Sequence, residues 1–333
     1  MMKMEGRFKM KLPRRNFLHL AAGAAALPAL SRIARAQAYP TRPVHVIVGF
    51  APGGTTDITA RLISQWLSER LGQQFVVENR TGAGSNIGTE AVVNAAPDGY
   101  TLLLATTTNA INATLYAKLN YDFIRDIAPI ATIGRVAYVV AVHPAFPAKT
   151  LLEFIAYAKA NPDRVNMAAV TGASDHMAGE LLKMMTGIDF VHVPYRGNAP
   201  ELTDLMAAQV QLVFPSIAAS LEYFRAGRLR ALAVTTTTRS QLLPDVPAVA
   251  EFFPGYEASG WYGVGVPKKT PTEIVEKLNR EINAAVAAPK LRARFADLGV
   301  EPMSMTPAEF EKFIAVETEK WGKVVKFTGL KPE

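Results

Sequence analysis

The sequence predicts an α/β protein with two lobes, and three observations support that prediction. Short apolar runs typical of buried strands alternate with segments whose apolar residues recur every third or fourth position, as on one face of a helix. The strand-like runs are almost continuously apolar, which is typical of parallel sheets covered by helices on both faces. They are also too numerous for one compact sheet, although no linker-like stretch divides the chain. Two lobes joined by strands that cross between them account for these observations.

The predicted elements alternate along most of the chain. The apolar runs that predict strands are 44–50, 75–79, 100–106, 138–143, 165–170, 210–216, 229–235 and 263–267. The segments whose spacing predicts helices are 57–71, 89–96, 150–161, 176–187, 199–209 and 272–288. We expect the chain to cross to the second lobe through 130–142 and to return around Trp261–Val266. The predicted lobes are then 39–136 with 263–333, and 137–262.

The positive charge of the chain lies in its first 38 residues. The formal net charge is +7, from 36 basic and 29 acidic residues. Residues 1–38 hold eight of the basic residues and a single acidic one, Glu5, so 28 of each kind remain in residues 39–333. Because that part has no basic surplus, we do not expect it to bind nucleic acid or an anionic membrane.

Residues 1–38 have the pattern of an export signal peptide. A basic stretch precedes an apolar region from Leu18 to Leu30, and Ala36 and Ala38 occupy the small positions of an Ala-x-Ala cleavage site. The alternative is a membrane anchor, but this apolar region is shorter than the roughly 20 residues that cross a hydrocarbon core. We therefore expect export, and a periplasmic mature protein.

The export route stays open. The sequence Arg14-Arg15-Asn16-Phe17-Leu18 resembles the twin-arginine consensus, whereas Pro13 and His19 depart from it. Either the twin-arginine or the general secretory pathway fits this pattern.

The chain contains no cysteine. This excludes disulfides, thiol catalysis and cysteine-bound metals, and it excludes a lipid-modified cysteine at the cleavage site. An exported protein without disulfides depends on its hydrophobic core, which a chain of 333 residues is long enough to supply.

The turn GFAPGGTTD, residues 49–57, joins a predicted strand to a predicted helix. It lacks the Gly-Lys-Ser/Thr ending of a nucleotide-binding loop, and its glycines do not have the spacing G-x-G-x-x-G. Gly53 and Gly54 would let the backbone approach a ligand closely, and the free N–H groups of the helix would point into the turn. A small carboxylate suits such a site, because no lysine or metal-binding residue accompanies it.

The alternative is an ordinary turn in which Thr55, Thr56 or Asp57 caps the helix. If the turn binds a ligand, we expect Gly54 to be required, because valine there would forbid a positive φ and block close approach. Asp57 would then be a helix cap or a partner for a ligand amino group, since a carboxylate repels a bound anion.

Three other segments follow predicted strands and could reach the same site. They are TGAGSNIG (81–88), TTTNA (106–110) and VTGASDHMAGE (170–180). In open α/β sheets ligands bind at the carboxyl ends of the strands, so these loops could converge on one cleft. Helix capping is the alternative interpretation of each.

Catalytic and metal-binding interpretations have weaker support. Ser174, Asp175 and His176 are consecutive, and the G-x-S-x-G elbow of a nucleophilic serine is missing. His176 and Glu180 are one helical turn apart, but the motif H-E-x-x-H and a third ligand are absent. Arg196 in VPYRGNAP could form a bidentate pair with a carboxylate, and a structural salt bridge is the alternative.

Long stretches of the chain match one family. They include VGFAPGGTTDITAR, VVENRTGAGSNIGTEAV, APDGYTLLL, HMAGELLKMMTGIDFVHVPYRGNAPELTDLMAAQVQLVF and WYGVGVPKKTPTEIVEKLNREI. The chain resembles the substrate-binding proteins of tripartite tricarboxylate transporters, the Bug family, over nearly all of residues 40–285. GASDH stands where a Gly-Ser form is more usual, and Thr106–Thr108 stand where Ser/Gly combinations are commoner.

The resemblance implies a two-lobed periplasmic-binding-protein fold, type II-like, with the ligand in a cleft between the lobes. One ligand carboxylate would be held between Phe50–Asp57 and Thr171–His176, largely by backbone N–H groups and bridging waters. The ligand-binding residues would be Phe50, Ala51, Gly53, Gly54, Thr55, Thr56, Asp57, Ser85, Asn86, Thr106, Thr107, Thr108, Thr171, Gly172, Ala173, Ser174, His176, Tyr195 and Arg196.

The implied function is that of a monomeric receptor without cofactor, metal or catalytic residue. It would capture a di- or tricarboxylate, an aromatic acid or an acidic amino acid and deliver it to a tripartite tricarboxylate-type permease in the cytoplasmic membrane. The alternative is an exported α/β hydrolase-like enzyme that acts on a small carboxylic acid.

Overall fold

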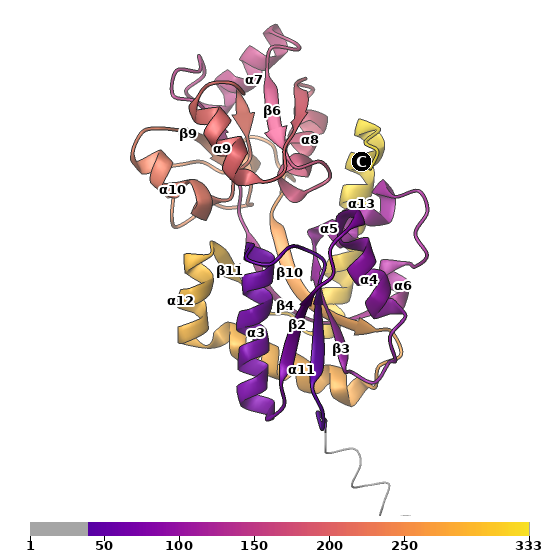
Figure 1. Cartoon of the computed structure of the whole chain (residues 1–333). Helices are drawn as coiled ribbons and strands as arrows, with labels where there is room; N and C mark the ends of the chain where they lie inside the picture. Colours follow the sequence, from indigo (N-terminus) through magenta and orange to yellow (C-terminus); the bar gives the residue numbers. More distant parts are fainter. Residues whose placement is uncertain (1–38, 333) are drawn as a thin grey trace, which may run out of the picture. The chain divides into compact units, whose positions relative to one another are not determined.

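The computed structural model describes residues 39–332, and the predicted export signal in residues 1–38 lies outside them. From Arg42 onward the chain forms one compact unit. Its strands form one sheet of six strands and one of five, with helices packed against both (Figure 1). The predicted α/β fold with two lobes is confirmed.

The six-stranded sheet has the order β11-β4-β10-β3-β1-β2. Strand β1 pairs in parallel with β2 and β3, whereas β10 is antiparallel to β3 and β4, and β11 is antiparallel to β4. The strands are β1 (Val44–Val48), β2 (Phe75–Asn79), β3 (Thr101–Thr106), β4 (Ile127–Val136), β10 (Gly260–Pro267) and β11 (Val300–Pro302).

The five-stranded sheet has the order β7-β6-β8-β5-β9. Strand β6 pairs in parallel with β7 and β8, and β5 is antiparallel to β8 and β9. The strands are β5 (Val139–Val142), β6 (Asn166–Ala169), β7 (Val191–Pro194), β8 (Leu212–Val213) and β9 (Arg230–Val234).

The expectation of parallel sheets was wrong, because both sheets are mixed. The chain leaves the six-stranded sheet at the end of β4 and starts β5 of the other sheet at Val139. It returns through β10, which runs against both of its neighbours. A strand buried on both faces reads as apolar whether its neighbours are parallel or antiparallel, so the sequence held no signal for the direction. The strands β7 and β11 were not predicted.

The helices pack on the sheets and on one another. Helices α11 and α13 lie against β4, α3 lies against β1 and β2, and α8 and α9 lie against β6. Helix α13 also contacts α5 and α8. The helices are α3 (Thr55–Leu71), α4 (Asn86–Val93), α5 (Thr107–Leu115), α6 (Phe123–Asp126), α7 (Leu151–Ala160), α8 (Ser174–Thr186), α9 (Asn198–Met206), α10 (Ile217–Arg225), α11 (Thr272–Ala287), α12 (Pro289–Asp297) and α13 (Pro307–Thr328), with short 3₁₀ turns η1 (Ala83–Ser85) and η2 (Val249–Glu251).

Each of the six predicted helices is present, with its bounds moved by a few residues. Helices α5, α6, α10, α12 and α13 were not among these six segments. The residues of α5 begin with threonines that were interpreted as a polar loop, and threonine is a weak helix former. In the structure the Asn109 side chain accepts the Thr106 N–H at 2.8 Å and so holds the start of α5.

The hydrophobic core continues through both sheets. One cluster of buried side chains includes Ile47 and Leu103 from the first sheet. It also includes Phe154 of α7, Phe214 directly after β8, and Trp321 of α13. Burying a side chain of this size contributes about 1.5–3 kcal/mol. The sheets therefore share a core, and the predicted lobe boundaries stay a prediction.

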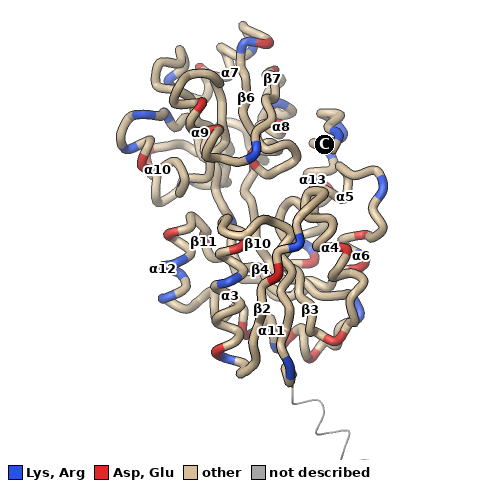
Figure 2. Tube along the Cα trace, in the orientation of Figure 1, with Lys and Arg blue, Asp and Glu red and all other residues tan. Residues whose placement is uncertain are grey.

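Charge is mixed over the described part of the chain, where Lys/Arg and Asp/Glu positions alternate along the trace (Figure 2). None of the helices in residues 39–332 combines the length and apolarity that crossing a membrane requires.

Candidate functional site

Loops from both sheets meet around a cavity of about 320 Å³. The loops β1–α3, β3–α5, β6–α8 and β7–α9 contribute from the carboxyl ends of their strands, and β10 crosses between them. This is where ligands bind in open α/β sheets. The cavity is lined by Phe50, Thr56, Thr106, Thr107, Thr108, Tyr138, Val170, Ala173, Ser174, Asp175, Arg196, Gly197, Asn198, Gly260, Trp261 and Tyr262.

The β1–α3 turn reaches the cavity with two side chains, Phe50 and Thr56. The other residues predicted from this turn do not line it: Ala51, Gly53, Gly54, Thr55 and Asp57.

Asp57 is buried and holds this turn from within. Its carboxylate accepts the Gly53 N–H at 2.9 Å, the Asn79 amide at 2.9 Å, and the Arg61 guanidinium at 2.9 and 3.0 Å. Burial by itself would raise the pKa of Asp57, but these bonds outweigh it and lower the pKa to about 2. The N–H of Gly53 is therefore already bonded, and Asp57 is a structural anchor of the turn.

The expectation that Gly54 needs a positive φ was wrong. Gly54 is the N-cap of α3 with φ −77° and ψ 166°, and a Cβ there would come no closer than 3.9 Å to Ala51 O. The positive φ in this turn belongs to Gly53, at 86°. When two glycines are adjacent, the sequence does not show which of them has the positive φ.

The β3–α5 loop presents three threonines, Thr106, Thr107 and Thr108, to the cavity. Thr107 Oγ1 accepts the Trp261 backbone N–H at 2.8 Å, which ties this loop to β10. Thr106 Oγ1 is buried and has no hydrogen-bond partner among residues 39–332. A buried hydroxyl normally has a partner, so Thr106 Oγ1 is an exception among the buried polar atoms.

The β6–α8 loop lines the cavity with Val170, Ala173, Ser174 and Asp175. Thr171, Gly172 and His176 were also predicted here but do not line it.

His176 supports this loop from behind. It is 1% exposed, stacks on His192 with 3.8 Å between ring centroids, and its Nδ1 accepts the Gly172 N–H at 3.1 Å. The bond holds Gly172 at φ 72° and so shapes the turn that presents Ala173 and Ser174.

The hydrolase alternative depends on contact between Ser174 and His176. The Ser174 side chain is hydrogen-bonded with Tyr138, whereas His176 Nδ1 bonds to Gly172 and His176 Nε2 lies 3.5 Å from Glu180. The geometry therefore shows no serine–histidine pair here. In the described residues no group of three or more potential metal-binding side chains gathers.

Asp175 is the acidic side chain of the cavity lining, and it lies beside a second buried acid. Asp175 is 5% exposed and Glu201 of α9 is 0% exposed. Burial raises the pKa of Asp175. Burial and the charge of Asp175 raise the pKa of Glu201 to about 8.

Arg196 is the basic side chain of the cavity lining. The structural salt bridge considered from the sequence is not found: in the part of the chain that the structure describes, no ion pair joins Arg196 to an acid. Its neighbour Tyr195, also predicted, does not line the cavity: its hydroxyl donates to Asp204, and its side chain packs against an apolar cluster that includes Leu202.

Ser85 and Asn86, predicted from the second glycine-rich turn, lie away from the cavity. Asn86 Oδ1 accepts hydrogen bonds from Asn112 Nδ2 at 2.9 Å and from the Tyr121 hydroxyl at 2.7 Å. The turn TGAGSNIG therefore packs within the first half of the chain.

Sequence reasoning missed several lining residues, which come from the crossing segments, the β6–α8 loop and the start of α9. They are Tyr138, Val170, Asp175, Gly197, Asn198, Gly260, Trp261 and Tyr262. Tyr138 and Trp261 lie within the predicted crossing segments, so their position was a usable signal. Gly260 is needed where it lies, because a Cβ there would come within 2.7 Å of the Tyr138 hydroxyl oxygen.

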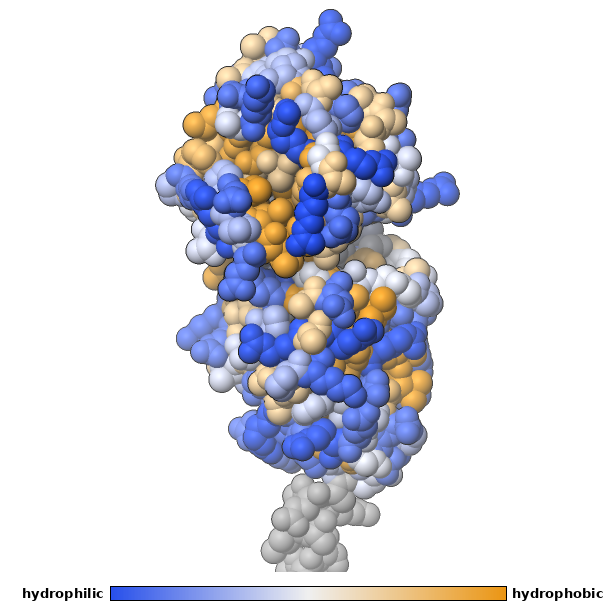
Figure 3. All heavy atoms as spheres, turned by 90° about the vertical axis from the view of Figure 1, so that its left-hand side faces the viewer, coloured by the Kyte–Doolittle hydropathy of each residue, from blue (hydrophilic) through white to orange (hydrophobic). Residues whose placement is uncertain are grey.

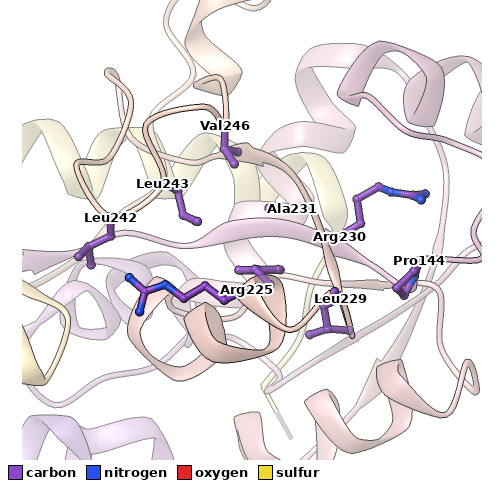
Figure 4. A pocket seen from close by; sticks show the side chains of 10 residues that line it. Pro144, Arg225, Leu229, Arg230, Ala231, Leu242, Leu243 and Val246 are labelled. Carbon is purple, nitrogen blue, oxygen red and sulfur yellow. The ribbon is translucent and has the colours of Figure 1, made fainter.

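A larger cavity of about 450 Å³ opens beside α10. Apolar residues gather on this face of the molecule (Figure 3). In Figure 4 Leu242, Leu243 and Val246 lie on one side of the cavity and Arg225 of α10 on the other.

The two arginines of this larger cavity already have partners. Arg225 pairs with Glu222 at 2.8 Å, and Arg230 donates to the carbonyls of Phe146 and Ala148 at 3.2 and 3.0 Å. Since specific ligand sites combine an apolar lining with convergent polar groups, the smaller cavity is the better candidate.

Comparison with known proteins shows the family of this chain. The model of the tripartite tricarboxylate transporter family receptor matches residues 59–330. The chain is 39% identical to protein BugT of Bordetella pertussis over 300 residues, which are 89% of this chain and 92% of BugT.

Two solved structures from Rhodopseudomonas palustris are also similar. Rpa4515 with adipate has a TM-score of 0.77 and 37% identity, over 89% of this chain and all of that one. MatC with bound malate has a TM-score of 0.73 and 31% identity, over 86% of this chain and all of that one. With a family model that spans most of the sequence and relatives this similar, the chain belongs to the tripartite tricarboxylate transporter receptor family, the solute-binding proteins that include BugT.

Proposed function

We propose that this receptor binds a small organic acid in the 320 Å³ cavity, with Arg196 holding one carboxylate of the ligand. The observation that carries the proposal is the unpaired guanidinium: Arg196 lines the cavity and has no acidic partner in the described residues. Arginine matches a carboxylate with two parallel hydrogen bonds, so a free arginine in a lined cavity is well suited to an organic anion.

The rest of the lining supports the same ligand. The threonines at the start of α5 and Ser174 at the start of α8 add hydroxyl donors. Helices α3, α5 and α8 also begin at loops that line the cavity, and a helix leaves its first N–H groups unbonded, which favours an anion there. Trp261 and Phe50 supply apolar surface for the carbon chain of the ligand.

Two similar proteins support a carboxylic acid as the ligand. Rpa4515 was solved with adipate and MatC with malate, both dicarboxylates. We propose a dicarboxylate or a related organic acid as the ligand of this chain, taken up in the periplasm after export and passed to a tripartite tricarboxylate-type permease in the cytoplasmic membrane.

The test is calorimetric titration of the purified mature protein with succinate, malate, adipate, citrate and benzoate, followed by Arg196→Ala with the best of these acids. A hydrogen bond to a charged group contributes about 1.5–3 kcal/mol, so its loss should raise the Kd roughly ten- to a hundredfold. The Kd of Arg196→Lys should fall between those of the wild type and Arg196→Ala, because lysine keeps the positive charge but cannot form the two parallel hydrogen bonds of a guanidinium.

Arg225→Ala is the matched control, since it removes an arginine from the larger cavity instead. It should leave the Kd unchanged. A Kd that responds to Arg225→Ala and not to Arg196→Ala would place the ligand beside α10 and contradict the proposal.

A further inference from the structure

The side chain of Tyr138 reaches from one crossing segment to the other at the wall of the ligand cavity. Tyr138 lies between β4 and β5, where the chain leaves the six-stranded sheet, and Gly260 begins β10, where it returns. Both residues line the cavity. A Cβ at position 260 would lie 2.7 Å from the Tyr138 hydroxyl oxygen. The hydroxyl therefore occupies space that every residue other than glycine would need at this position.

Gly260 is required for this space and not for backbone freedom. It pairs with Val136 in the antiparallel β4–β10 ladder, and it is not among the glycines with positive φ. An alanine adopts such a strand conformation without strain. After the hydroxyl oxygen, the atoms nearest to the Cβ position are Tyr138 Cζ at 3.5 Å and Cε2 at 3.6 Å, which are ordinary van der Waals distances. A single oxygen atom of Tyr138 thus decides whether a methyl group fits at position 260.

The main chain of Tyr138 is held in place by Thr235, the residue directly after β9. The Tyr138 N–H donates to Thr235 Oγ1 at 3.0 Å, and the Tyr138 carbonyl accepts the Thr235 N–H at 3.0 Å and the Thr235 hydroxyl at 3.2 Å. Thr235 is buried, and its carbonyl accepts the Ala258 N–H at 3.0 Å in the returning segment. One threonine therefore bonds to both crossing segments. With its main chain fixed, Tyr138 can make room for a ligand only by turning its ring.

The next cavity-lining residue of β10 is fixed as well. Trp261 donates its backbone N–H to Thr107 Oγ1 at 2.8 Å and its indole N–H to Glu317 Oε2 at 3.1 Å. Closely packed side chains of this kind adjust little to a ligand of the wrong size. A fixed apolar wall discriminates between ligands that differ by one methylene by about tenfold or more.

We propose that Tyr138, packed against Gly260, sets the size of the largest acid that the cavity accepts. The inference rests on the proposed function. The ring closes the cavity where the chain crosses between the sheets, so an acid longer than the remaining space would have to displace it. Linear dicarboxylates that differ by one methylene are the ligands that such a wall distinguishes.

The experiment measures the Kd of succinate, glutarate, adipate, pimelate and suberate by calorimetric titration at pH 7. In the wild type, the acid one methylene longer than the tightest one should bind about tenfold or more weakly. Tyr138→Ala removes the ring and leaves space for the longer acid. In this variant the ratio of the Kd of the longer acid to that of the acid preferred by the wild type should fall to about one or less.

The outcomes separate this inference from the proposed function. An unchanged ratio in Tyr138→Ala would overturn the inference and leave the proposed function intact. A wild type that binds suberate most tightly would do the same, because the ring would then not limit the series. If the wild type binds none of the five acids, the inference fails, and the proposed function fails with it only if malate, citrate and benzoate do not bind either.

Gly260→Ala tests the contact between the ring and β10 in a protein that keeps the tyrosine. The added methyl group should turn the ring out of its position, so the Kd of the preferred acid should rise about tenfold or more. Adding Tyr138→Phe removes the one atom in the way. The double variant should therefore bind as tightly as Tyr138→Phe alone, within about twofold. An unchanged Kd in Gly260→Ala, or a double variant that stays as weak as Gly260→Ala, would contradict the inference.

Gly263→Ala in the same strand is the matched control. A Cβ there would come within 2.3 Å of Phe310 Cζ in the core, so Tyr138→Phe should not restore what this variant loses. Restoration would show that phenylalanine at position 138 acts by a general effect and would contradict the inference. Tyr157→Phe removes a hydroxyl from α7, where the ring packs against Phe146 outside the cavity lining, and should change neither Kd nor ratio. Circular dichroism and melting curves would confirm that each variant is folded.

Discussion

Asp57 shows how a residue can support a binding turn without contacting the ligand cavity. Its buried carboxylate joins the Gly53 N–H, Asn79 and Arg61, three groups that the turn brings together. The sequence interpretation of Asp57 as a helix cap or a partner for a ligand amino group overlooked Asn79, which is distant in sequence. The carboxylate therefore stabilises the loop that presents Phe50 and Thr56 to the cavity.

We expect Asp57→Ala to destabilise the protein by about 2–3 kcal/mol, because it leaves buried donors without their charged acceptor. The folded-state pKa of Asp57 is about 2, below its ordinary value of 3.8. The stability that ionised Asp57 contributes to the folded protein is therefore present above about pH 4, and it is lost as the pH falls toward 2. Urea unfolding of the wild type and Asp57→Ala at pH 7, 4 and 2.5 measures this contribution. A free-energy gap between the two proteins that does not shrink with falling pH would contradict this role.

At the scale of elements, α13 fixes the wall of the cavity that β10 supplies. Glu317 of α13 is buried, and its Oε2 accepts the indole N–H groups of Trp261 at 3.1 Å and Trp321 at 2.9 Å. Its Oε1 lies 2.5 Å from Lys320 Nζ. Helix α13 also contacts α8, so one helix touches β10 and the element that carries Ser174 and Asp175.

Glu317→Ala should destabilise the protein by about 2–4 kcal/mol and weaken ligand binding, because it leaves two buried indole N–H groups and Lys320 without their acceptor. The affinity should drop severalfold as Trp261 loses its fixed position. Glu319→Ala, an exposed α13 residue that pairs with Lys323, is the control and should change neither quantity. Unfolding curves and ligand titrations of both variants provide the measurement. An unchanged affinity in Glu317→Ala would show that packing alone holds Trp261.

At the scale of the whole molecule, the cavity is lined from both sheets, so a bound ligand contacts elements of each. A ligand that binds only the folded state stabilises it by RT ln(1 + [L]/Kd), about 2.7 kcal/mol at a hundredfold excess over Kd.

We therefore expect the tightest carboxylate to raise the melting temperature in proportion to the logarithm of its concentration. At the same ligand concentration the gain should shrink to about 0.4–1.4 kcal/mol in Arg196→Ala, because the Kd of that variant is expected to be ten- to a hundredfold higher. Thermal unfolding followed by calorimetry checks both statements. An equal gain in the variant would mean that Arg196 does not hold the ligand.

The sequence by itself determined the order and nature of most elements. Apolar periodicity located the six predicted helices and most of the strands, because burial of one face leaves a pattern that does not depend on distant residues. It also located the three cavity-lining loops that follow β1, β3 and β6, because parallel strands expose their carboxyl ends at one edge. The family followed from motifs spread along nearly the whole chain.

Only the tertiary structure decided which residues face the ligand. The sequence does not show that β10 is antiparallel to its neighbours, because a buried strand is apolar whether its pairing is parallel or antiparallel. The turn at Gly53 rather than Gly54, and the withdrawal of His176 behind its loop, depend on contacts with Asp57 and His192. Asp175 was weighed only as part of a catalytic trio, because its partner Glu201 lies on another helix. The protonation of acids such as Asp175 and Glu201 depends on burial and on neighbours from distant segments, and the local sequence predicts neither.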